Sequence, residues 1–226
     1  MCVDKIAGLK AGRLPIYEPG PQELVQRGLR RKRLSFSSEL SGAVDEAEVL
    51  FIAVDTRQNG DGSADLSSVA AVARGIGRAL AEANRERPLV VNKSTVPVGS
   101  GDYVSMLIRD GIKEAGGPSS EGVDFLVVSN PEFVQEGSAI YDSLYPDRIV
   151  VGAGSSEALD TLRTLYGPII EQSFPTELDP RPKVTVPFVC TDLPSAEMIK
   201  YAANAFLATK YRHSAPRTLA RSLHTR

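Results

Sequence analysis

The chain has few of the residues on which many catalytic and metal sites depend. Its two cysteines, Cys2 and Cys190, lie far apart and form no CxxC or Cys/His spacing, which argues against a disulfide framework or a zinc site. Its two histidines, His213 and His224, both fall within the last 14 residues. Any acid–base chemistry in the rest of the chain must therefore use Glu, Asp, Lys, Tyr or water.

The sequence also lacks long apolar runs and a strong excess of basic charge. No run approaches the length of a membrane span, and the first residues lack the basic and apolar segments of a signal peptide, so we expect a cytoplasmic protein. The net charge is −2, but residues 211–226 hold four of the 26 basic residues and no acid. The remaining 22 basic and 28 acidic residues give the body a charge of −6, which argues against nucleic-acid binding.

Short apolar runs alternate with amphipathic stretches along most of the 226 residues. This alternation predicts an α/β fold with a doubly wound, Rossmann-like and mostly parallel sheet, because buried parallel strands read as continuous Val- and Ile-rich runs. Ligands of such folds bind at the carboxyl ends of the strands. The expected strands are 49–54, 89–91, 125–128 and 148–151, and the expected helices are 21–31, 64–82, 101–114 and 155–166.

The pattern changes after residue 173. Residues 174–187 hold four prolines and predict a loop, and residues 195–210 predict a last helix. Residues 211–226 are rich in Arg and Ser without an apolar period, so we expect a disordered or non-native basic tail there. The domain division is therefore 1–192 for the sheet domain, 193–210 for the start of a central connecting helix, and 211–226 for the tail.

Three segments carry candidate chemistry, and each also has a purely structural interpretation. Thr95 follows a strand and precedes a helix, where its hydroxyl could bind a phosphate, a ribose or a reacting hydroxyl, or simply cap a turn. Glu132 and Glu136 follow Pro131, where one carboxylate could act as a base, or both could favour a helix dipole. Lys200 and Asn204 share a helix face and could stabilise an oxyanion, or be an ordinary surface pair.

A fourth segment, "VVGAGSSEAL", looks like a dinucleotide fingerprint. Its Gly152-x-Gly154 follows a strand and precedes a helix, but Glu157 occupies the third glycine position and would place negative charge near a pyrophosphate. We therefore interpret it as a strand-to-helix turn.

Taken in order, the segments "KIAGLKAGRLPIYEPG", "AEVLFIAV", "NKSTVPVGSG", "SNPEFVQEGSAIYDSLYPDRIVVG" and "AEMIKYAANAFLATK" resemble the UDP-glucose 6-dehydrogenases of the wider UDP-glucose/GDP-mannose dehydrogenase family. The resemblance covers nearly all of residues 5 to 210. It implies NAD-dependent oxidation of the C6 hydroxyl of a nucleotide sugar to a carboxylate. UDP-glucose is the first choice of substrate, ahead of UDP-N-acetylmannosamine and GDP-mannose.

The resemblance also implies roles for individual residues. It assigns Thr95 to orienting water and cofactor, Glu132 to general-base or water-positioning chemistry, and Lys200 with Asn204 to stabilising oxyanions. The substrate-binding residues it implies are Glu132, Phe133, Val134, Glu136, Lys200 and Asn204. The residues it implies for NAD binding are Lys5, Thr56, Thr95 and Glu136. It implies no metal.

Departures from the family pattern qualify this expectation. The first strand, glycine-rich turn and helix of the family do not precede Met1, and Asp55-Thr56-Arg57 replaces a Gly-Thr-Pro turn. The nucleophilic cysteine and the continuing dimer helix of the family would lie beyond Lys210, and Cys190 does not match that cysteine. We therefore expect an N-terminal-half fragment that is inactive alone, whose full-length form is a homodimer. The alternative is a non-catalytic module that binds a sugar nucleotide or NAD.

Overall fold

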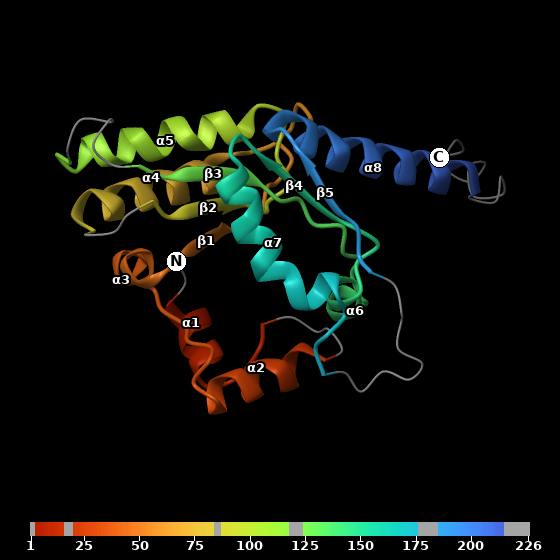
Figure 1. Ribbon diagram of the computed structural model, residues 1–226, viewed down its shortest axis with the longest axis horizontal. Helices are drawn as coiled ribbons and strands as arrows, with labels where there is room; N and C mark the ends of the chain where they lie inside the picture. The colour runs from red at the N-terminus through yellow and green to blue at the C-terminus, as the bar shows by residue number, and fades with distance from the viewer. Residues whose placement is uncertain (1–2, 16–19, 84–86, 118–123, 176–184, 215–226) are drawn as a thin grey trace, which may run out of the picture.

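The computed structural model describes residues 3–15, 20–83, 87–117, 124–175 and 185–214. A five-stranded sheet lies at the centre, with its strands side by side in chain order (Figure 1). The strands are β1 (Val49–Ile52), β2 (Leu89–Asn92), β3 (Leu126–Ser129), β4 (Ile149–Ala153) and β5 (Phe188–Thr191). This arrangement confirms the expected α/β, Rossmann-like fold, with one reversal described below.

Helices surround the sheet, and their bounds follow the expected ones closely where the sequence pattern is long. The four helices predicted between residues 21 and 166 all form, and the last of them continues to Ile170. The helices are α1 (Val3–Lys10), α2 (Pro21–Arg30), α3 (Leu40–Glu46), α4 (Ser67–Glu82), α5 (Ser100–Glu114), α6 (Ala139–Leu144), α7 (Ser156–Ile170) and α8 (Leu193–Ser214).

The sheet has a separate apolar core on each face. Side chains alternate along β2, so that Val90 packs with the buried residues of α4 and α5, whereas Leu89 and Val91 pack with those of α7. All four residues of β2 are buried, as expected for a central strand covered on both faces. Helices α1 and α2 lie apart from these layers, below the edge strand β1 in Figure 1.

Helices α4 and α5 approach each other backbone to backbone. A Cβ atom added to Gly77 would stand 2.0 Å from the carbonyl oxygen of Ile108, and one added to Gly111 would stand 2.2 Å from that of Arg74. Neither oxygen belongs to a flexible side chain, so only glycine fits at these two positions. The close contact sets the positions of α4 against β1 and of α5 against β3.

The direction of the sheet reverses between β3 and β4. Strands β1, β2 and β3 are parallel, β3 and β4 are antiparallel, and β4 and β5 are again parallel. The chain leaves the carboxyl end of β3 at Asn130 and begins β4 at Ile149 beside that same end. It can do so because the short α6 between them does not cross a face of the sheet. The expectation of a mostly parallel sheet did not include this reversal.

Other elements also differ from expectation. Strand β5 lies between the predicted loop and the predicted last helix, and α1, α3 and α6 are short helices that we did not predict. Helix α8 continues through Ser214, four residues past the expected boundary at Lys210, and residues 215–226 lie outside the described part of the chain. Of the predicted loop 174–187, residues 176–184 also lie outside it.

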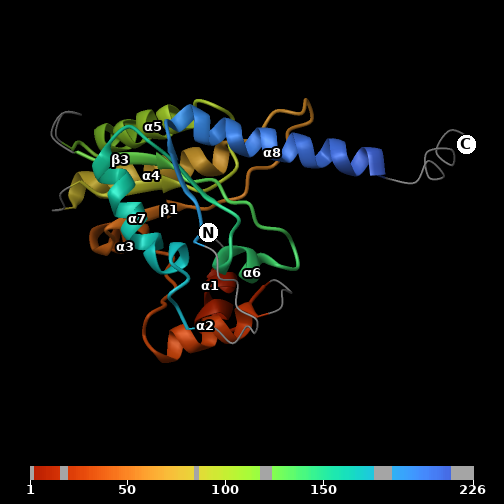
Figure 2. The same cartoon turned by 45° about the vertical axis from the view of Figure 1, so that its right-hand side comes forward.

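Helix α8 begins against α5, β3 and β4 and then extends beyond the sheet, as the two views in Figure 1 and Figure 2 both show. Its early residues therefore lie beside the ends of the central strands. Among the described residues, no helix is both long enough and apolar enough to cross a membrane.

The contact between α4 and α5 leads to a stability prediction. We expect Gly77→Ala to lower the free energy of unfolding by about 1–3 kcal/mol, because the added methyl group overpacks a backbone contact. Gly42→Ala, in α3, is the matched control, since no atom lies within 4 Å of its added Cβ and alanine favours a helix. Urea unfolding measures both. Equal stability of the two variants would contradict the backbone contact.

Candidate active site

The polar residues that follow β2 and β3 meet at one edge of the sheet. The amide of Asn130 donates to the carbonyl oxygen of Asn92 at 2.9 Å, which extends the pairing of the two strands by one step. The Ser94 hydroxyl accepts from the Val54 amide at 2.9 Å and donates to the Val54 carbonyl at 2.7 Å. Ser94 therefore has a structural role, joining the ends of β1 and β2, and it leaves its neighbours Lys93 and Thr95 for the site.

A buried carboxylate joins α8 to this edge. Glu197 is 3% exposed, and its Oε2 accepts from the Gly99 amide at 2.6 Å. Its Oε1 accepts from the Gly101 amide at 2.8 Å and from the Ser129 hydroxyl at 3.0 Å. No residue of α5 caps its own N-terminus through a side chain, so Glu197 provides the negative charge that the end of a helix favours.

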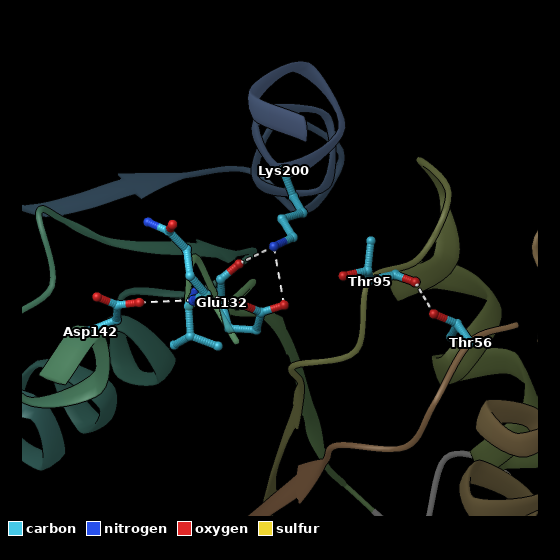
Figure 3. Close-up of polar contacts among 7 residues, drawn as sticks. Thr56, Thr95, Glu132, Asp142 and Lys200 are labelled. Atoms are coloured by element: carbon cyan, nitrogen blue, oxygen red, sulfur yellow. Dashed lines mark hydrogen bonds and ion pairs between the residues drawn. The ribbon is translucent and has the colours of Figure 1, made fainter. Parts of the chain in front are cut away.

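Lys200 lies one turn beyond Glu197 on α8 and reaches the end of β3. Its ammonium donates to Glu132 Oε1 at 3.1 Å and also to the backbone oxygen of Glu132 (Figure 3). The Lys200 side chain is 8% exposed and that of Glu132 is 30% exposed. Because desolvation offsets much of the attraction in a buried ion pair, the contact is better evidence for a fixed orientation than for added stability.

Two cations flank the ring of Phe133. The Arg148 guanidinium carbon lies 4.3 Å from the ring centroid, and the Lys200 ammonium lies 5.3 Å from it. The reversal between β3 and β4 places Arg148 here, directly before β4. Such cation–π contacts orient the ring and keep positive charge at this edge.

Phe133 and Arg148 border a cavity of about 280 Å³. Its polar lining includes Lys93, Glu132, Arg148 and Tyr166. Tyr166 donates to Asn130 Oδ1 at 2.6 Å, and burial raises the pKa of its hydroxyl. Burial lowers the pKa of the Lys93 ammonium, with Glu132 opposing this shift and Lys200 adding to it. The cavity therefore places several charged groups beside apolar walls, as small-molecule sites commonly do.

Thr95 and Thr56 lie on the other side of Glu132 from this cavity. The Thr56 hydroxyl donates to the backbone oxygen of Thr95 at 2.8 Å, which links the segments that follow β1 and β2 (Figure 3). Thr95 and Lys200 both line a second, much smaller cavity. The structure therefore brings together Thr56, Thr95, Glu132, Phe133 and Lys200 among the predicted site residues.

The remaining predicted residues lie outside this group. Val134 lines the larger cavity, and its amide donates to Glu132 Oε2 at 2.8 Å. Glu136 is exposed in a turn before α6, and Asn204 is exposed one turn beyond Lys200 on α8. Lys5 is exposed on α1. The roles of Glu136, Asn204 and Lys5 therefore stay predictions.

Sequence reasoning missed three charged residues of this edge. Lys93 adjoins the predicted Thr95, and its place directly after a buried strand was a usable signal. Glu197 lies three residues before Lys200, on the same helix face, which also could have been recognised. Arg148 had no such signal, because its position depends on the reversal between β3 and β4.

The Gly152-x-Gly154 segment is a strand-to-helix turn, as we interpreted it. Gly152 pairs with Ser129 and Ala153 pairs with Val128. Because β4 runs antiparallel to β3, the turn that follows it leads away from the carboxyl end of β3, where the site lies. Glu157 pairs with Arg87, which precedes β2 at the opposite edge, at 2.8 Å. A Cβ on Gly152 would lie 2.5 Å from the Asp192 carbonyl oxygen, so this glycine allows the start of α8 to pack on β4.

A mixed α/β sheet with a polar site at the carboxyl ends of its parallel strands defines a Rossmann-like domain of the nucleotide-binding class. Comparison with known proteins narrows this class. Residues 1–170 match the model of the "UDP-glucose/GDP-mannose dehydrogenase family, NAD binding domain". The chain therefore belongs to the UDP-glucose/GDP-mannose dehydrogenase family, whose members depend on NAD.

Individual relatives agree with this assignment. The chain is 42% identical over 207 residues to a UDP-glucose 6-dehydrogenase of Pseudomonas aeruginosa, covering 92% of this chain and 41% of the relative. It is 43% identical over 218 residues to a UDP-glucose 6-dehydrogenase of Rhizobium meliloti, covering 93% and 44%. The chain thus spans less than half the length of these relatives.

Solved structures give the same result. A UDP-glucose dehydrogenase of Pyrobaculum islandicum superposes with a TM-score of 0.76 at 39% identity, covering 92% of this chain and 43% of that one. A ternary complex of GDP-mannose dehydrogenase from Pseudomonas aeruginosa gives a TM-score of 0.78 at 36% identity, covering 93% and 44%. The Rossmann-like fold is therefore confirmed.

The described residues suit the ribose of NAD better than its pyrophosphate. Thr56 and Thr95 bring hydroxyls to the strand ends, where such groups can bind a ribose. The N-terminus of α4 is less suited to a phosphate, because Asp65 Oδ1 already accepts from the Ser67 amide at 2.8 Å. Within the described residues, β1 pairs with β2 on one side and with no strand on the other. In that part of the chain, no glycine-rich turn that leads from a strand into a helix lies on that unpaired side to hold a pyrophosphate.

The burial of Lys93 leads to a pH prediction. Because its folded pKa lies below the 10.5 of an ordinary lysine, the unfolded chain holds this proton to higher pH than the folded chain does. The stability of the wild type should therefore gain a rising contribution as the pH increases from the folded pKa to about 10.5. Lys93→Met should lack this contribution.

Unfolding in urea between pH 7 and pH 10.5 measures this difference. Lys113→Met, at an exposed position in the last turn of α5, is the control and should keep the wild-type pH dependence. The same pH dependence in Lys93→Met and wild type would show that Lys93 is not desolvated as described.

Proposed function

We propose that this chain supplies the NAD-binding half, and part of the catalytic site, of a dehydrogenase that oxidises UDP-glucose to UDP-glucuronate. The contact of Lys200 with Glu132 at the carboxyl edge carries this proposal. Family membership supports it, because the relatives with 42% and 43% identity are UDP-glucose 6-dehydrogenases.

Oxidation of a primary alcohol needs two kinds of group from the protein. A base must receive the hydroxyl proton, and positive charge must stabilise the oxygen as that proton leaves. Glu132 offers a carboxylate, and Lys200 offers an ammonium whose orientation the carboxylate and backbone oxygen of Glu132 fix. NAD, when bound, accepts the hydride that leaves the C6 carbon.

Other residues take supporting roles in this proposal. Thr56 and Thr95 would hold NAD at the strand ends, and Thr95 would orient a water for the second oxidation. Asn204 would act beside Lys200, and Glu136 with Lys5 would reach the cofactor. Cys190 takes no part, because it lies on β5 against Arg163 and lines neither cavity of the site.

The larger cavity is where we place the sugar nucleotide. Lys93 and Arg148 bring positive charge to its wall, which suits a diphosphate, while Phe133 and Val134 provide apolar surface. UDP-glucose is the proposed substrate, with UDP-N-acetylmannosamine and GDP-mannose as the next candidates.

We also propose that the full assembly is a cytoplasmic homodimer that associates through α8. Among residues 193–210 of this helix, whose side chains the structure describes, four large apolar side chains are exposed, and Phe206 is 77% exposed. Apolar side chains gathered along a helix that extends beyond its own sheet commonly mark an interface. The four residues are Met198, Tyr201, Phe206 and Leu207.

Calorimetry with UDP-glucose tests the binding proposal. We expect the purified chain to bind UDP-glucose, and Lys200→Met to weaken that binding by roughly tenfold or more, because a hydrogen-bonded charge is lost from the site. Lys113→Met, on an exposed turn of α5, should bind as the wild type does.

Two outcomes would decide against the proposal. An absence of binding heat from a chain with a cooperative unfolding transition would refute it. Unchanged affinity of Lys200→Met would remove Lys200 from the site. A parallel assay of UDP-glucose-dependent NADH formation tests the expectation that the 226-residue chain is inactive alone, which measurable turnover would overturn.

A further inference from the structure

Asn92 is a buried polar side chain without a protein partner. It is the last residue of β2, is 2% exposed, and faces the same side of the sheet as Val90 and Ser129. Neither Nδ2 nor Oδ1 of its amide has a hydrogen-bond partner among the described residues. Buried amides in native proteins nearly always have partners, so this side chain needs an account.

Lys200 is a second buried polar residue whose hydrogen bonding is incomplete. Its ammonium carries three N–H donors, and the described residues accept two of them, both through Glu132. The side chain is 8% exposed, so bulk water has little access to the third donor. The Phe133 ring, whose centroid lies 5.3 Å from the ammonium, provides a cation–π contact but no conventional hydrogen-bond acceptor, and a buried charged donor without an acceptor is costly.

One small cavity connects these two groups. Its volume is about 10 Å³, at the lower end of the roughly 10–15 Å³ that a single bound water needs. Asn92 and Lys200 both line it, so the residue with the unpaired amide and the residue with the incompletely paired ammonium border the same space. The other lining residues are Ser94, Thr95, Val96, Ser129, Pro131 and Glu197.

We infer that this cavity binds one water molecule, which accepts a hydrogen bond from the Lys200 ammonium and donates one to the Asn92 amide oxygen. Ser129, Thr95 and Glu197 supply further polar groups around it. A buried water typically makes two to four hydrogen bonds, and these residues offer that many. The size of the cavity excludes a larger ligand.

The water makes Asn92 a positioning residue. Through it, the end of β2 holds the third donor of Lys200, while Glu132 at the end of β3 holds the other two. The ammonium is then held from two strands and has little freedom to rotate away. This inference concerns the resting chain and does not depend on the proposed activity.

A high-resolution crystal structure of the 226-residue chain tests the water directly. We expect an ordered water within hydrogen-bonding distance of both Asn92 and Lys200. A closed cavity, with the Asn92 amide bonded directly to protein atoms, would overturn the inference.

A variant tests the positioning role in solution. Asn92→Leu replaces the amide by an apolar group of similar size, and the water should lose its partner. We expect the Lys200 ammonium protons, followed by NMR of the ¹⁵Nζ signal, to exchange with solvent roughly tenfold faster, because a hydrogen bond to a charged group is lost.

Gln172→Met is the matched control, because it removes another buried amide whose Oε1 is also unpartnered, and whose contacts are with Leu144 and Ile169 instead. It should leave the Lys200 exchange rate unchanged. An equal rate in Asn92→Leu and wild type would overturn the positioning role. If Asn92→Leu fails to fold, the crystal structure of the wild type still decides the presence of the water.

Discussion

The buried Glu197 carboxylate is the interaction on which the site depends. Its hydrogen bonds to Gly99, Gly101 and Ser129 join the N-terminus of α5, the end of β3 and the first turns of α8. A buried carboxylate requires several donors, and these three are available only when α8 lies on this edge of the sheet. The position of α8 then fixes that of Lys200, one helical turn further on.

The close approach of these elements also needs small residues. A Cβ on Gly101 would lie 2.9 Å from Leu193 Cδ2, and one on Gly152 would lie 2.6 Å from the Cβ of Ala196. Both glycines therefore allow the beginning of α8 to approach the sheet domain closely. The buried charge and the two glycines act together: the glycines permit the approach and the carboxylate specifies its register.

A second constraint comes from the chain reversal between β3 and β4. Because the connection returns to the end of the sheet that it left, Glu132 at its start and Arg148 at its end line the same cavity, and the Arg148 guanidinium lies over the ring of Phe133. A connection that crossed a face of the sheet would instead have returned the chain to the amino end of β3, and β4 would then run parallel to it. The reversal therefore gives one edge of the sheet both the carboxylate and the additional cation.

Much of this fold could be predicted from the sequence, because long amphipathic helices and continuous Val-rich strands have clear periodicity. Strand β5 could not, since four residues next to a proline-rich segment carry little pattern. The direction of β4 is a matter of tertiary path, which local propensity does not encode. Within the site, the positions of Glu132 after a strand and of Lys200 on a helix face made both candidates with a structural alternative, and the family resemblance supplied their specific roles. The proximity of Glu197 to Lys200 on one helix face could have been recognised, but its burial could not, because it depends on amides almost 100 residues away.

Native-state hydrogen exchange at the Gly101 amide tests the central claim most directly. If Glu197 fixes α8 and α5 on the sheet, this amide should exchange only through global unfolding, with the same free energy as the amide of Val91 in the central strand β2. If Gly101 exchanges through a low-energy local opening while Val91 stays protected, α8 is loosely attached. The geometry of Lys200 would then not be set by the buried carboxylate.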